Sequence, residues 1–165
     1  MTYPLEIKPL SDRELVMTRV FDAPRQLVFD AWTKPELLQK WLGVRGGWTM
    51  PVCEVDLRVG GAYRFVWRSE KGAEMGVGGV YREVVRPERI VNTERFDDAW
   101  YPGEALITHD LEERSGKTTS TVTIRYESTE ARDQVLASPM DRGVAESYAV
   151  LDGVLGSTTG ARPAV

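Results

Sequence analysis

The 165-residue sequence has few residues that could stabilise a small fold through a covalent link or a metal, since it contains one cysteine and one histidine. Cys53 has no second cysteine with which to close an internal disulfide, so a reducing cytoplasm is the expected location. His109 and Cys53 together are too few for a standard zinc site. We therefore expect neither a metal nor another cofactor.

Long hydrophobic runs and an excess of positive charge are also missing. No segment approaches the roughly 20 apolar residues that a membrane-spanning helix needs, and the first residues contain no apolar signal-peptide core. The formal net charge is -4, with arginines and carboxylates interspersed along the chain, so no basic stripe is available for a phosphate backbone. We expect a soluble protein that binds neither nucleic acid nor a membrane.

The length suits a single domain covering residues 1–165, with poorly ordered ends at 1–13 and 156–165. Alternating apolar and β-branched residues, separated by turn signals, predict a series of strands. The predicted strands are Leu15 to Phe21, Thr49 to Leu57, Ala62 to Arg68, Gly76 to Val85, Arg89 to Phe96, Glu104 to Leu111 and Thr118 to Tyr126. Short connections favour an antiparallel meander, so we expect one antiparallel sheet of about six or seven strands.

Helical periodicity predicts two short helices after the first strand and two more at the C-terminal end. Thr33 to Glu36 has the pattern of a capping box, which would begin the second helix, and Gly43 would end it. A short helix is expected from Glu130 to Leu136. The last and longest helix is expected from Met140 to about Leu155.

Several strings, in this order and spacing, carry a resemblance to a known family. They are Arg19 to Pro24, Val28 to Thr33, Pro35 to Leu37, Trp41 to Gly43, Val55 to Gly61, Gly79 to Tyr81, Pro87 to Val91 and Tyr126 to Met140. The sequence resembles the activator of heat-shock-protein-90 ATPase homologue-like (C-terminal-domain-like) family, within the START-like or SRPBCC superfamily. The resemblance implies an α+β helix-grip fold, in which a curved sheet wraps the long C-terminal helix and leaves a hydrophobic cavity.

Inward-facing aromatic and apolar residues are the candidates for binding a ligand in that cavity. They are Trp41, Trp48, Phe65, Trp67, Tyr81, His109, Met140, Val144 and Tyr148. The alternative is that these side chains only pack a dry core. Asn92 and Glu94 share one face of their strand and would reach the cavity if Ile90 and Phe96 do.

Residues with acid, base or nucleophile chemistry are few, and each has a structural alternative. His109 lies on the apolar face of its strand, where it could transfer protons with Tyr81, but a lone histidine more often satisfies a core hydrogen bond. Glu54 and Asp56 face the same way, yet arginines on the neighbouring strand favour a surface charge ladder. Cys53 has no base beside it and is expected in the core.

Three functions remain open from the sequence. The first is a binder or carrier of a small apolar or amphipathic molecule, which we favour over catalysis. The second is a cyclase, dehydratase or hydrolase that uses the same cavity. The third is a chaperone-associated interaction module with a packed interior. An exposed edge strand and helix in such folds also favour a homodimer.

Overall fold

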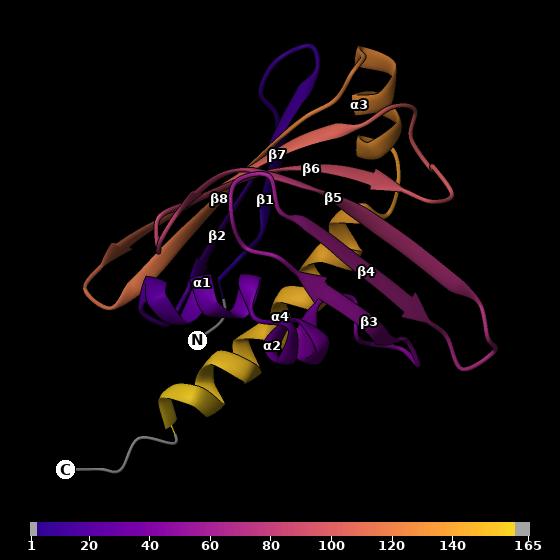
Figure 1. The fold of residues 1–165 in the computed structure, drawn as a ribbon. Helices are drawn as coiled ribbons and strands as arrows, with labels where there is room; N and C mark the ends of the chain where they lie inside the picture. Colours follow the sequence, from indigo (N-terminus) through magenta and orange to yellow (C-terminus); the bar gives the residue numbers. More distant parts are fainter. Residues whose placement is uncertain (1–2, 161–165) are drawn as a thin grey trace.

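The computed structural model describes residues 3–160, in which one antiparallel sheet curves over a long C-terminal helix (Figure 1). The strand order across the sheet is β1-β2-β8-β7-β6-β5-β4-β3. The strands are β1 Glu6–Pro9, β2 Glu14–Phe21, β3 Thr49–Val55, β4 Ala62–Arg68, β5 Glu74–Val85, β6 Arg89–Phe96, β7 Ala105–Arg114 and β8 Lys117–Arg125. The helices are α1 Arg25–Thr33, α2 Pro35–Trp41, α3 Thr129–Leu136 and α4 Met140–Gly160. The predicted helix-grip fold is confirmed.

The described sheet has eight strands, not the six or seven expected. The additional strand, β1, pairs with the edge of β2 in a segment for which the sequence predicted no regular element. Only Ile7 in β1 packs against the core, so the segment carries too little alternation to identify it, and its pairing depends on β2. Helix α4 continues past the predicted end to Gly160, and residues 161–165 lie outside the described residues.

The start of α2 differs from the predicted capping box. Lys34 is the N-cap residue and makes no side-chain cap, because its ammonium group has no atom that could accept a hydrogen bond from the helix. Thr33 is the last residue of α1, and its hydroxyl donates to the Phe29 carbonyl at 2.8 Å. Gly43 follows α2 with φ +67°, the left-handed conformation expected for a helix terminator.

A glycine-rich stretch of β5 lets the sheet bend where β5 and β6 approach closely. A Cβ atom added at Gly79 would lie 2.0 Å from the Thr93 carbonyl oxygen of β6, which only glycine avoids. The register between these strands shifts between Tyr81 and Glu83, as in a β-bulge. Glycine at position 79 therefore permits the close pairing of β5 with β6 just before this irregularity.

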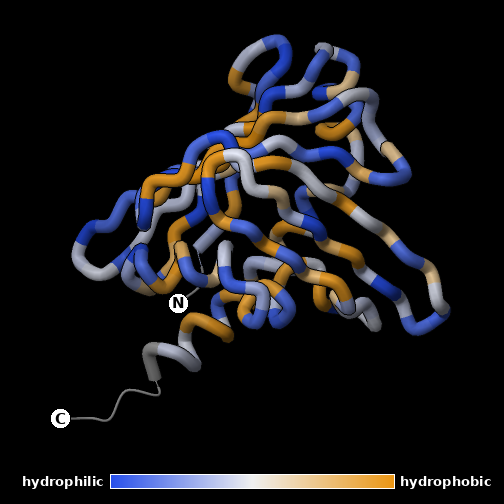
Figure 2. The backbone as a smooth tube through the Cα atoms, viewed as in Figure 1, coloured by the Kyte–Doolittle hydropathy of each residue, from blue (hydrophilic) through white to orange (hydrophobic). Residues whose placement is uncertain are grey.

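Helix α4 is held against the concave face of the sheet by apolar packing and by one buried ion pair. Hydrophobic stretches follow the strands and α4, and hydrophilic stretches gather in the turns at the rim (Figure 2). Arg19 of β2 is buried, and its guanidinium makes two hydrogen bonds to Asp152 of α4, at 2.8 and 2.5 Å. This bidentate pair fixes the C-terminal half of α4 across the sheet.

Candidate functional site

A cavity of about 630 Å³ lies between α4 and the concave face of the sheet and is partly open to solvent. This volume falls within the range of about 300–1,000 Å³ that is typical of small-molecule sites. Its wall includes all nine predicted binding residues: Trp41, Trp48, Phe65, Trp67, Tyr81, His109, Met140, Val144 and Tyr148. The structure thus brings these residues together around one space, and their contact with a ligand stays a prediction.

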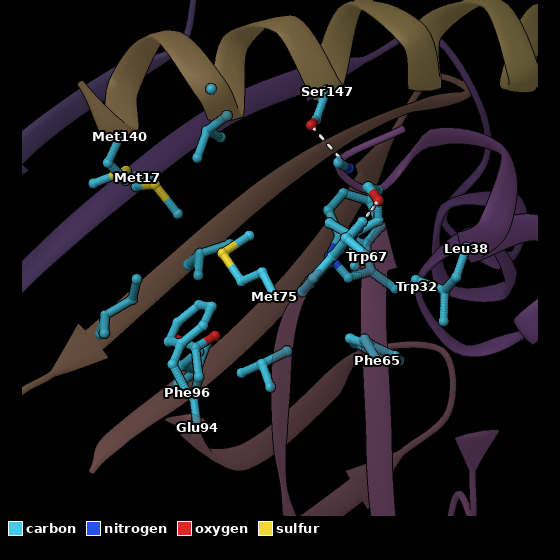
Figure 3. Close-up of a pocket in the computed structure, with 18 of the residues that line it drawn as sticks. Met17, Trp32, Leu38, Phe65, Trp67, Met75, Glu94, Phe96, Met140 and Ser147 are labelled. Carbon is cyan, nitrogen blue, oxygen red and sulfur yellow. Dashed lines mark hydrogen bonds between the residues drawn. The ribbon is translucent and has the colours of Figure 1, made fainter. Parts of the chain in front are cut away.

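The side chains that line the cavity come from three directions. Met140 and Ser147 point down from α4, Glu94 and Phe96 lie on the sheet below, and Trp32 closes the side from α1 (Figure 3). Ile90 and Asn92 also belong to the wall, so the conditional prediction for β6 holds: Asn92 and Glu94 do reach the cavity.

One end of the cavity, which we call the aromatic end, is formed by Trp32, Trp41, Tyr148 and His109. The Trp32 ring lies 5.0 Å from Trp41, 5.8 Å from Tyr148 and 6.3 Å from His109, measured between ring centroids in edge-to-face arrangements. Trp32 was not among the residues predicted to bind a ligand. Its position depends on how α1 docks against β7, which periodicity does not specify.

His109 is a neutral imidazole at this end. Burial lowers its pKa to about 4, because the cationic form would lose its hydration. Its Nδ1 atom is enclosed and has no hydrogen-bond partner among the described residues. The expectation of a satisfied core histidine is therefore wrong for this atom, and the ring faces the cavity instead.

The opposite end, which we call the carboxylate end, is formed by the wall residues Glu94, Phe96 and Tyr126 together with Tyr101, which contacts Glu94 but does not itself line the cavity. The Tyr101 hydroxyl donates a hydrogen bond to Glu94 Oε1 at 3.0 Å. Desolvation by the surrounding protein raises the pKa of Glu94 to about 7, and the Tyr101 hydrogen bond opposes part of this shift. Tyr101 was assigned to a turn by the sequence, so no periodic signal could have placed it beside Glu94.

The two titratable groups are too far apart to act as one acid–base pair. On neighbouring strands, Ile90 pairs with His109 and Glu94 pairs with Ala105, so four residues separate them along the sheet. That spacing corresponds to about 13 Å. Burial also raises the pKa of Tyr81 above its usual range, so its phenol stays protonated near neutral pH and is not a base there.

The segment after α2 forms one lip of the cavity. The Gly43 N–H donates to Ser147 Oγ of α4 at 3.2 Å, and Trp67 Nε1 donates to the Leu42 carbonyl at 2.7 Å (Figure 3). An Arg45–Glu146 ion pair at 2.5 Å ties the same segment to α4. These contacts hold the lip between α4 and the sheet.

Other candidates from the sequence lie outside the site chemistry. Burial raises the pKa of the Cys53 thiol to about 11, so it is not a nucleophile at neutral pH. Asp56 forms its ion pair with Arg58 at 2.9 Å, within the same loop and not across the strands as the charge ladder predicted.

Within residues 3–160, no group of three or more acidic, cysteine or histidine residues could hold a metal ion. None of the helices in that range is long and apolar enough to span a bilayer.

Comparison with known proteins identifies the family. Residues 22–156 match the family described as Activator of Hsp90 ATPase homolog 1-like protein. The chain belongs to this family. A crystal structure of a Rhodobacter sphaeroides protein is 34% identical, has a TM-score of 0.88, and is matched over 93% of this chain and 98% of that one.

Two further solved structures are similar to this chain and support the same fold. A Chromobacterium violaceum protein is 30% identical with a TM-score of 0.73, over 88% of this chain and 98% of that one. An Aeromonas hydrophila structure, named as a member of this family, is 18% identical with a TM-score of 0.66, over 84% of this chain and 93% of that one. A search of curated proteins gave no match.

Proposed function

We propose that this protein binds a small, largely apolar molecule in the cavity beneath α4. The observation that carries the proposal is the size of that cavity, about 630 Å³, in a wall made mostly of apolar and aromatic side chains. Natural cores are packed without voids of this size, and an empty apolar space forfeits contacts that a ligand would restore. A bound apolar molecule would therefore stabilise the fold that encloses it.

The test uses N-phenyl-1-naphthylamine, an uncharged apolar probe whose fluorescence rises when it leaves water. The wild-type protein should bind it saturably and show a raised melting temperature. Val144→Trp places an indole from α4 into the cavity and should weaken binding at least about tenfold by filling the space. Ala149→Trp, on the exposed side of the same helix, is the matched control and should bind as the wild type does.

Equal binding by Val144→Trp and the wild type would place the probe elsewhere and contradict the proposal. No binding by any variant would also contradict it. That second result would favour the other candidate, a chaperone-associated interaction module, which the description of the family supports. Stimulation of the ATPase activity of a purified heat-shock protein 90 is the direct measurement for that candidate.

A further inference from the structure

The carboxylate end holds a charged group that the protein itself leaves without a counter-ion. Glu94 lines the cavity, and its one hydrogen bond to a described residue is the one it accepts from Tyr101. No lysine or arginine within residues 3–160 forms an ion pair with it, and the only arginine or lysine in the cavity wall is Arg45 at the lip, which pairs with Glu146. A carboxyl group in an apolar site without a cation is costly and is seldom kept for stability alone.

Aromatic rings surround this carboxyl group. The Tyr101 ring lies 5.1 Å from Trp100, 6.1 Å from Phe96 and 5.1 Å from Tyr126, measured between centroids. Burial raises the pKa of Tyr63, Tyr101 and Tyr126, and the charge of Glu94 adds to each shift, so all three phenols lie within its electrostatic reach. Ring faces attract cations through their quadrupoles, and aromatic residues beside a carboxylate are a common feature of sites that bind ammonium groups.

From a single carboxylate among aromatic rings, at one end of an otherwise apolar cavity, we propose that the ligand is an amine: a protonated nitrogen held by Glu94, on an apolar body that fills the rest of the space. This inference rests on the proposed function, because it assigns a ligand class to the same cavity. The ammonium group would neutralise the carboxylate and donate to Oε2, the oxygen that Tyr101 does not use.

Binding of this kind depends on pH in a defined direction. The titratable groups near Glu94 are Tyr63 from β4, Tyr101 from the β6–β7 loop and Tyr126 after β8, and burial keeps all three protonated. The residues of α3 and α4 nearest this end of the cavity are Val135, Met140 and Val144, which do not titrate. The remaining titratable side chains of the wall are Arg45, Tyr81, His109 and Tyr148. Glu94 is therefore the group whose ionisation controls binding of a cation near neutral pH.

The experiment compares 4-phenylbutylamine with 4-phenylbutanol, which share one apolar body and differ in the head group. By calorimetry, the wild type should bind the amine at least about tenfold more tightly than the alcohol at about pH 8. Glu94→Gln should abolish this preference while binding the alcohol as the wild type does, which also shows that the variant cavity is intact. In the wild type, affinity for the amine should rise about tenfold from about pH 5.5 to about pH 8, since the amine stays protonated while Glu94 ionises.

The possible failures are distinct. If neither compound binds the wild type, the proposed function fails. If the alcohol binds but the amine is not preferred, or if Glu94→Gln keeps the preference, the amine inference is overturned and cavity binding stands. A fall in affinity for both compounds as pH rises would also overturn it, because that result identifies the protonated acid as a donor to a neutral ligand.

Discussion

Each end of the cavity holds a titratable side chain in an apolar environment, and burial shifts the pKa of the two side chains in opposite directions. At the aromatic end, burial lowers the pKa of His109 to about 4, so the ring is neutral throughout the physiological range. At the carboxylate end, burial raises the pKa of Glu94 to about 7, so the charge of that side chain changes within the same range. Desolvation is the leading cause in both cases, and it acts with opposite sign on an acid and a base.

The aromatic end therefore keeps one charge state over the physiological pH range, whereas the charge at the carboxylate end changes with pH. The packing of the two ends differs as well. Close to the aromatic end lie the fully enclosed residues Phe21, Trp41 and Leu151, and the Arg19–Asp152 pair joins β2 to α4. At the carboxylate end Tyr101 and Tyr126 are buried, but Phe96, and the nearby wall residues Trp100 and Met140, are only partly buried. We expect substitutions at the first end to affect stability most, and those at the second to affect binding and pH dependence.

The largest effect is expected from Trp41→Ala at the aromatic end. Trp41 is 1% exposed, and its Nε1 donates to the Ala31 carbonyl at 2.9 Å, so truncation removes both packing and a buried hydrogen bond. Urea unfolding should show a loss of about 4 kcal/mol. Met140→Ala, whose partly buried side chain lines the cavity, should lose less than about 1 kcal/mol. Equal losses would mean that the two ends are packed alike.

Breaking the ion pair at the aromatic end is expected to have the next largest effect. Asp152→Asn leaves the buried Arg19 guanidinium without a counter-charge, which should destabilise the fold by about 3 kcal/mol. Glu146→Gln is the control, because it removes the partner of Arg45 from an exposed pair and should cost less than about 1 kcal/mol. Both variants are compared with the wild type by thermal and urea unfolding. Equal losses of stability in Asp152→Asn and Glu146→Gln would contradict the prediction.

At the carboxylate end, Glu94→Gln should stabilise the protein in a pH-dependent way. The folded pKa is about 7 against an ordinary value of 4.5, so the wild type loses stability as pH rises from about 4.5 to about 7. Glutamine does not ionise and avoids this loss. The variant should match the wild type below about pH 4.5 and exceed it by about 2 kcal/mol at about pH 8, a value reduced because the cavity partly solvates the side chain. A constant difference at all pH values would contradict the raised pKa.

The alternation of residue types in the sequence predicted which side chains of a strand face inward. Contacts between residues far apart in the chain could not be predicted in this way. Alternation placed Tyr63, Phe65 and Trp67 on the inner face of β4, where the structure has them. It also placed Asn92 and Glu94 on one face of β6. Tyr101 could not be placed, because it reaches Glu94 from a turn whose path depends on the whole sheet.

The cavity itself illustrates the same limit. A pattern of apolar residues identifies which side chains face inward, but it does not say whether their volumes fill the space between α4 and the sheet. The resemblance to a family supplied that expectation, and the distance at which α4 packs determines the remaining volume of about 630 Å³. The pKa shifts of Glu94 and His109 follow from that same packing, so they too were beyond the sequence.

The smallest effect is expected from His109→Leu at the aromatic end, where the gain in stability should appear at acidic pH and not at alkaline pH as for Glu94→Gln. The folded pKa of His109 is about 4 against an ordinary value of 6.5, so the wild type loses stability as pH falls from about 6.5 to about 4. Leucine removes that loss together with the unpartnered Nδ1 atom. Near neutral pH the variant should be as stable as the wild type, to within measurement error. At about pH 5 it should be more stable by about 1 kcal/mol, a value lower than the full pKa shift implies because the cavity partly solvates the side chain. A gain in stability at alkaline pH and none at acidic pH would mean that the imidazole is charged in the folded protein. Burial would then not shift the pKa values of His109 and Glu94 in opposite directions.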